Sequence, residues 1–125
     1  MNSSLKEIYY YAHSKQIYNT EREHREIKYI NKKFGKIINP NTDIGEMGNI
    51  EPYLIAISNS KGVVCSEYKG HIGRGVYEEI LYAIKNKLPV YVIKRFLKKY
   101  IIKKVMCVKI IDRYDWKIRY GKIII

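Results

Sequence analysis

GHIGRGVYEEILYA, residues 70–83, is the stretch from which the fold can be read. It follows one short apolar run (VVC) and precedes another (VYVI), so it predicts a strand, a glycine loop, a helix and a second strand. Gly73 and Gly75 allow the loop to approach a ligand closely. The helix start offers unpaired N–H groups and a positive dipole end, and Arg74 adds a positive charge. This combination predicts a small-molecule site, with a tight turn into an ordinary surface helix as the alternative.

Helical periodicity distinguishes two adjacent carboxylates in this stretch. At about 100° per residue, Val76, Ile80 and Ala83 share one face of the helix. Glu79 lies at the edge of that face, whereas Glu78 points nearly opposite, toward solvent. A carboxylate that leans inward is costly to bury unless it has a partner or a function. We therefore predict that Glu79 is the functional carboxylate and that Glu78 is solvated.

Length and composition predict a single domain, 1–125, with a core at 7–94 and a C-terminal extension at 95–125. The hydrophobic content of 46% is typical of a globular chain. The sequence has no apolar run of membrane-spanning length, and its N-terminal residues lack the apolar core of a signal peptide. We therefore expect a cytoplasmic protein without a membrane partner. The formal net charge of +12 favours association with polyanions in general, although lysines are spread over most of the chain.

The rest of the chain alternates strand and helix patterns. They predict a strand at 7–12, a helix at 20–35 that begins with a Thr20/Glu23 capping box, a strand at 36–40, a helix at 50–60, a strand at 63–66, the helix of the opening stretch to about residue 87, and a strand at 90–94. Such alternation predicts an α/β fold, namely a flavodoxin-like or Rossmann-like three-layer sandwich with a parallel sheet in the order 2-1-3-4-5. Ligands bind such sheets outside the carboxyl ends of the strands, which here means the loops 13–19, 39–49 and 67–75.

The C-terminal part departs from this pattern. Its spacing predicts a short basic amphipathic helix at 94–101, a fifth strand at 105–111, a turn at 112–115, and an antiparallel sixth strand at 116–120 with 123–125. The basic segment 94–104, with Phe96 and Tyr100, keeps nucleic-acid binding open as a further function.

Four residues outside the glycine loop are candidates for binding a substrate. His13 follows the first strand, where it would hydrogen-bond a sugar or phosphate or act as an acid or base. Tyr11 and Tyr18 are close enough to the loop 13–19 to stack on a base, and Asn39 could contact a ribose hydroxyl. The structural alternatives are a surface histidine, core aromatic residues and a turn-forming asparagine. No histidine or cysteine spacing fits a metal site, and we expect neither metal nor cofactor.

Five motifs occur in an order and spacing that are fairly specific: IYYYAH at 8–13, YNTE at 18–21, IINPN at 37–41, GRGVYEEI at 73–80 with Ala83, and LPVYV at 88–92. Together they resemble the nucleoside 2-deoxyribosyltransferase-like family and its small archaeal, bacterial and phage relatives. The resemblance covers residues 7–94.

The resemblance implies that Glu79 is a nucleophile. The corresponding glutamate of the family attacks the anomeric carbon, and another base or water resolves the glycosyl-enzyme. Arg74 and the helix start would hold a phosphate, and His13 or Tyr11 would contact the sugar or base. Relatives of this fold often complete a pocket from a neighbour, so we expect a homodimer.

The sequence departs from the family where acidic residues are usual, at NSKG (59–62) and KGH (69–71). Two kinds of function for the pocket therefore stay open. The first is a nucleoside- or nucleotide-binding protein that cleaves or transfers at the N-glycosidic bond. The second is a protein that binds a nucleotide, or a nucleotide-derived signal, without turnover. A basic nucleic-acid-binding protein is the third possibility for the chain.

Overall fold

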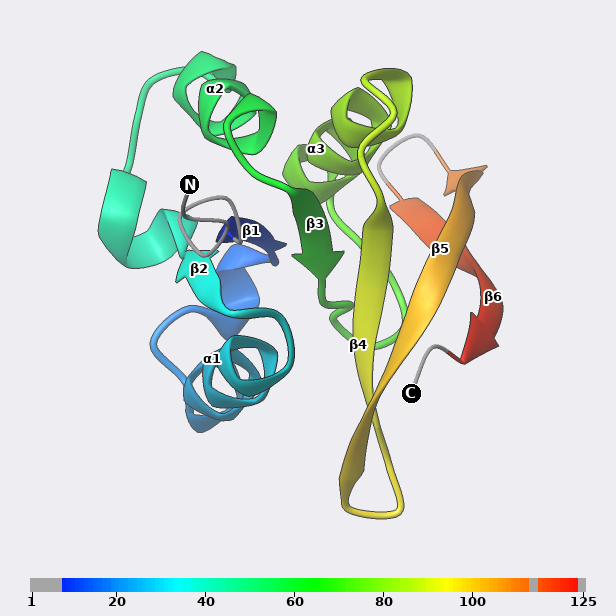
Figure 1. The fold of residues 1–125 in the computed structure, drawn as a ribbon. Helices are drawn as coiled ribbons and strands as arrows, with labels where there is room; N and C mark the ends of the chain where they lie inside the picture. The colour runs from blue at the N-terminus through cyan, green and yellow to red at the C-terminus, as the bar shows by residue number, and fades with distance from the viewer. Residues whose placement is uncertain (1–7, 113–114, 124–125) are drawn as a thin grey trace.

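The computed structural model describes residues 8–112 and 115–123, and the strands of this α/β chain form one mixed sheet (Figure 1). In chain order the elements are β1 (Ile8–Ala12), α1 (Glu21–Phe34), β2 (Lys36–Ile38), α2 (Glu51–Ser58), β3 (Gly62–Cys65), α3 (Arg74–Lys85), β4 (Val90–Phe96), β5 (Lys99–Asp112) and β6 (Asp115–Ile123). A short 3-10 helix, η2 (Lys15–Ile17), follows β1, and a π-helix, η3 (Pro40–Ile44), follows β2.

The strand order is β2-β1-β3-β4-β5-β6. The first four strands pair in parallel, which confirms the predicted order of the N-terminal part. The fifth strand lies beside the fourth, but it runs antiparallel to it, so the prediction of a parallel fifth strand is wrong. β6 is antiparallel to β5, as predicted. Residues 113–114 of the predicted turn at 112–115 lie outside the described residues, as do the last two residues, 124–125.

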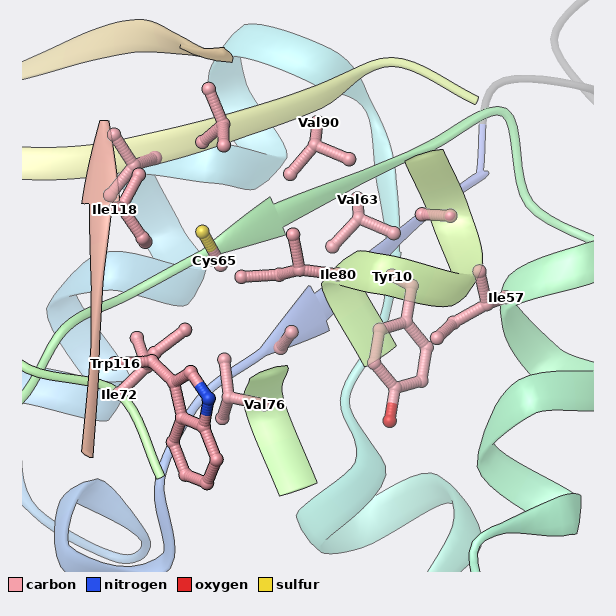
Figure 2. Packing of buried hydrophobic residues seen from close by; sticks show 14 residues of the cluster. Tyr10, Ile57, Val63, Cys65, Ile72, Val76, Ile80, Val90, Trp116 and Ile118 are labelled. Atoms are coloured by element: carbon pink, nitrogen blue, oxygen red, sulfur yellow. The ribbon is translucent and has the colours of Figure 1, made fainter. Parts of the chain in front are cut away.

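Helices cover both faces of the parallel part of the sheet. α1 packs on one face, where Ile30 joins a buried cluster with Tyr9, Tyr11 and Val64. α2 and α3 pack on the other face, and the larger cluster there includes Ile57 and Ile80 with the strand residues Tyr10, Val63 and Cys65 (Figure 2). No helix in the described part of the chain has the length and apolar character needed to cross a bilayer.

Local signals in the sequence explain where α1 begins and ends. The Thr20 side chain accepts a hydrogen bond from the Glu23 backbone N–H, as the capping box predicts. Gly35 follows the last turn with a φ of 111°, a conformation that glycine adopts readily. The chain therefore leaves α1 directly into β2, at the edge of the sheet.

The segment 94–101 is a β-hairpin, so the helix predicted there is wrong. β4 and β5 continue through it, and Phe96 pairs with Lys99 across the two-residue loop of Leu97 and Lys98. Both loop residues have positive φ, 51° and 65°, as a type I′ turn requires. Such turns favour the sequence Asn-Gly, which this turn lacks, so the sequence carries no hairpin signal here. The apolar residues of the segment also fit the spacing of a helix, and this is why the pattern predicts a helix.

Replacing Leu97 and Lys98 by Asn and Gly should stabilise the protein. Non-glycine residues in the left-handed region are strained, so Leu97→Asn/Lys98→Gly is expected to raise the free energy of unfolding by about 1 kcal/mol. Urea unfolding measures the change. The control Lys28→Gly, at an exposed position inside α1, should lower the same free energy by about 1 kcal/mol. A loss of stability in the turn variant would contradict the turn assignment.

Candidate functional site

A pocket of about 510 Å³ opens at the carboxyl end of the parallel strands, in the size range of small-molecule sites. Three segments line it: the loop after β1, the loop into α2, and the first turns of α3. The lining residues are His13, Ser14, Lys15, Gln16, Tyr18, Met47, Gly48, Asn49, Ile50, Tyr53, Gly73, Arg74, Gly75, Val76, Glu78 and Glu79. Six of the predicted site residues therefore line the pocket: His13, Tyr18, Gly73, Arg74, Gly75 and Glu79.

Glu79 lies in the pocket wall with 7% of its surface exposed, which confirms the inward orientation that helical phase predicted. Its Oε2 accepts a hydrogen bond from the hydroxyl of Tyr10, a residue of β1, which lies between β2 and β3 in the sheet. Burial raises the pKa of Glu79 from its ordinary value of 4.5 to about 7; the Tyr10 bond opposes this rise and the charge of Glu78 adds to it. At neutral pH, Glu79 therefore exists in both protonation states.

Tyr10 was missed by sequence reasoning as a site residue. Burial and the nearby charge of Glu79 raise the pKa of Tyr10 far above its ordinary value, so its hydroxyl keeps its proton and remains a donor. Strand alternation places Tyr10 on the face opposite Tyr9 and Tyr11. Strand alternation could therefore have identified Tyr10 as a partner of Glu79, because it puts Tyr10 on the face of the sheet that α3 covers.

Two further tyrosines line the pocket near Glu79. Burial and the charge of Glu79 raise the pKa of Tyr18 to about 12, so its hydroxyl is neutral at physiological pH. Tyr53 holds the loop before α2, because its hydroxyl donates to the Gly45 carbonyl at 2.7 Å and accepts from the Met47 N–H at 3.2 Å. The pocket thus combines aromatic walls with one buried carboxyl group.

His13 borders the pocket, but its ring is engaged within the protein. Its side chain is fully buried, with Nδ1 at 3.0 Å from the Tyr11 carbonyl oxygen and Nε2 at 2.7 Å from Glu23 Oε2. Both partners are hydrogen-bond acceptors. The prediction that His13 bonds a sugar or phosphate is therefore not supported by its geometry, because neither ring nitrogen is left for a substrate.

Glu23 connects the loops around the pocket. Besides His13, it accepts hydrogen bonds from the Asn19 backbone N–H at 3.0 Å and from the Asn41 side chain at 3.1 Å. Burial alone would raise its pKa, but these hydrogen bonds outweigh burial and lower it. The sequence had indicated only a capping residue at this position, since the partners come from separate loops.

Two predicted substrate-binding residues do not reach the pocket. Tyr11 is fully buried on the α1 face, where its hydroxyl donates to Glu26 Oε1 at 2.5 Å. Asn39 caps the π-helix η3, because its Oδ1 accepts from the Asn41 N–H at 3.1 Å. Both residues lie near the end of a strand, as predicted. The Tyr11 side chain points to the α1 face, however, and the Asn39 side chain is used in capping η3.

The glycine loop forms the start of α3, as predicted. Gly73 is its N-cap residue, no side chain caps the helix, and the first turn carries no acidic residue. Arg74 is exposed and donates from Nε to Glu78 Oε1 at 2.9 Å, which places Glu78 at the rim and away from the buried face.

No group of three potential metal ligands occurs in the described residues. A scan against protein families and searches of curated proteins and of solved structures give no match to this chain. The resemblance to the deoxyribosyltransferase-like family and the homodimer that it implies stay predictions.

The raised pKa of Glu79 makes stability depend on pH. Between pH 4.5 and about 7, the folded protein binds more protons at this carboxyl than the unfolded chain does, so ionising it in the folded state costs stability. Relative to Glu79→Gln, the wild type should lose about 3 kcal/mol of unfolding free energy as pH rises through this window and then level off. Urea unfolding at several pH values measures this difference. Parallel curves for the two proteins would contradict a raised pKa.

Proposed function

We propose that the pocket binds a nucleoside or nucleotide and that Glu79 cleaves its N-glycosidic bond as a nucleophile. The observation that carries this proposal is the buried Glu79 carboxyl in the pocket wall, with a pKa of about 7 and a hydrogen bond from Tyr10. This is the glutamate to which the family resemblance gives the nucleophilic role. The pocket also lies where ligands bind in sheets of this strand order, near the switch between β1 and β3.

The reaction consists of two displacements. In the first, Glu79 Oε1 forms a bond to the anomeric carbon and the carbon–nitrogen bond breaks; the base leaves with the bonding electrons and takes a proton from solvent. In the second, water attacks the anomeric carbon, the ester bond breaks, Glu79 is released as a carboxylate and one proton returns to solvent. Tyr10, as a positioning residue, holds Oε2 throughout and leaves Oε1 for the attack.

The other features of the pocket suit the same ligand. Tyr18 and Tyr53 supply aromatic surface for a base, and Ile50 adds an apolar contact. The uncapped start of α3 offers N–H groups and a positive dipole end for a phosphate or for sugar hydroxyls. A flavodoxin-like arrangement would place these groups together at one edge of the sheet.

Binding without turnover is the second candidate. Among the described residues that line the pocket, Glu78 is the other carboxylate, and it is paired with Arg74. His13 has both ring nitrogens engaged. Neither Glu78 nor His13 is therefore placed to protonate a leaving base, which favours a protein that holds a nucleotide intact or that acts only on bases able to leave without such help.

Incubation with a panel of nucleosides and nucleotides, with release of free base as the readout, tests the proposal. Glu79→Ala should lower the rate by on the order of 10³-fold or more, because no other group replaces the nucleophile. The matched control Glu21→Gln, an exposed carboxylate on α1, should retain the wild-type rate. Thermal stabilisation by a nucleotide without base release would select the second candidate, and absence of both effects would refute the two together.

Activity should rise with pH through about 7, because only ionised Glu79 is nucleophilic. The Tyr10 hydrogen bond lowers the pKa of Glu79, so Tyr10→Phe is expected to move the midpoint of kcat/KM against pH to a higher value. The pH profile separates this role from mere packing. If Tyr10→Phe reduces the rate equally at every pH, Tyr10 does not tune Glu79.

A further inference from the structure

The β4–β5 hairpin projects beyond the body of the sheet (Figure 1). β4 has seven residues, whereas its parallel neighbour β3 has four, and the extra length continues past the carboxyl edge. β4 runs parallel to β3, so the hairpin leaves the sheet at the same edge as the loops that form the pocket. It forms a two-stranded ribbon with a two-residue loop at its tip.

The tip of this ribbon exposes large apolar side chains at a strained position. Phe96 is 64% exposed and Leu97 is 79% exposed. Leu97 also has a φ of 51°, a conformation that asparagine or glycine would adopt more readily. Neither burial within the chain nor turn geometry explains a leucine here, which points to an external contact.

The ribbon is strongly basic. Residues 94 to 104 include six positive side chains and no acidic one: Lys94, Arg95, Lys98, Lys99, Lys103 and Lys104. The first four lie on the projecting part, whereas Lys103 and Lys104 pair with β4 where β4 also pairs with β3. Lys94 pairs with Glu67 at 3.3 Å. Alternation along the strands distributes the basic residues of the ribbon over both faces, since Arg95 lies on the α1 side and Lys94 and Lys99 lie on the other.

We propose that this hairpin binds double-stranded DNA by lying in the major groove. The groove is about 12 Å wide and admits a two-stranded β-ribbon, with phosphates along both of its walls. Basic side chains on both faces of the ribbon would contact both phosphate backbones, and the apolar tip would contact base edges or thymine methyl groups. The proposal does not rest on Glu79 or on the proposed function.

The aromatic rings of the hairpin argue against single-stranded nucleic acid. Stacking of unpaired bases needs open ring faces. The Tyr100 ring is contacted by Arg95 and by Tyr29, and the Tyr91 ring by Lys104 and Phe34. Phe96 is thus the one exposed ring between residues 90 and 104, too little for a stacking platform.

The arrangement of charge on the projecting part of the hairpin argues against an anionic membrane. Lys98 lies at the tip, Arg95 lies on the α1 face, and Lys94 and Lys99 lie on the other face. A flat membrane that meets the tip would contact one end of this arrangement, whereas a groove with phosphates along both walls contacts both faces.

Binding of a short, labelled, mixed-sequence DNA duplex, measured by fluorescence anisotropy from about 50 mM salt upward, tests the proposal. The triple variant Arg95→Gln/Lys98→Gln/Lys99→Gln should weaken binding at least about tenfold and reduce the slope of log affinity against log salt by about 3. The control Lys28→Gln/Lys32→Gln/Lys36→Gln removes the same charge from exposed positions on α1 and β2, at the opposite side of the sheet. It should leave the slope unchanged.

The turn variant Leu97→Asn/Lys98→Gly separates loss of DNA binding from loss of folding. It is expected to be more stable than the wild type, yet to bind DNA more weakly because it lacks the apolar side chain of Leu97 and the charge of Lys98. Equal loss in the control triple, or unchanged binding in both hairpin variants, overturns the proposal. So does a preference for duplex RNA, whose deep, narrow major groove excludes the ribbon, or binding to anionic vesicles without binding to DNA.

Discussion

Two neighbouring hydroxyl groups on β1 fix the helices on both faces of the sheet. Tyr10 donates to Glu79 on α3, and Tyr11 donates to Glu26 on α1. Successive residues of a strand point to opposite faces, so side chains of this one strand reach both helix layers. A buried carboxylate without a donor would cost several kcal/mol, and each helix is therefore held at the rotation and height at which its glutamate meets a tyrosine. For α3 this rotation also directs its first turn toward the pocket.

The two glutamates differ in what else surrounds them. Glu26 Oε2 accepts from Arg22 at 3.0 Å and from Ser66 at 2.9 Å, so a cation and a second donor compensate its charge. Among the described residues, Glu79 has no cation at bonding distance, because its neighbour Arg74 is paired with Glu78. The same tyrosine–carboxylate contact therefore serves packing on one face and leaves a titratable group in a pocket on the other. Both glutamates have a tyrosine donor, so the difference between them is the cation that pairs with Glu26.

How far the sequence predicts this arrangement depends on the range of each interaction. Helical phase is local, and it was sufficient to place Glu79 inward and the helix start at the pocket. The partner Tyr10 lies 69 residues away, and the contact follows only once β1 and α3 are packed together. The contact between His13 and Glu23 also follows only once the loop after β1 is packed against α1. The hairpin was misassigned because Phe96, Leu97, Tyr100 and Ile101 also fit a helix, and strand pairing decided between the two.

The pKa of Glu79 shows which electrostatic effect dominates at this edge of the sheet. A net charge of +12 would by itself favour the ionised carboxylate and lower its pKa, yet the pKa is raised to about 7. The nearest cations at the pocket rim are already paired, Arg74 with Glu78 and Lys15 with Glu46. More distant lysines act through solvent, which screens them beyond about 8 Å. Local burial therefore sets the pKa of the carboxyl in the pocket, whereas solvent screens the excess positive charge of the more distant lysines.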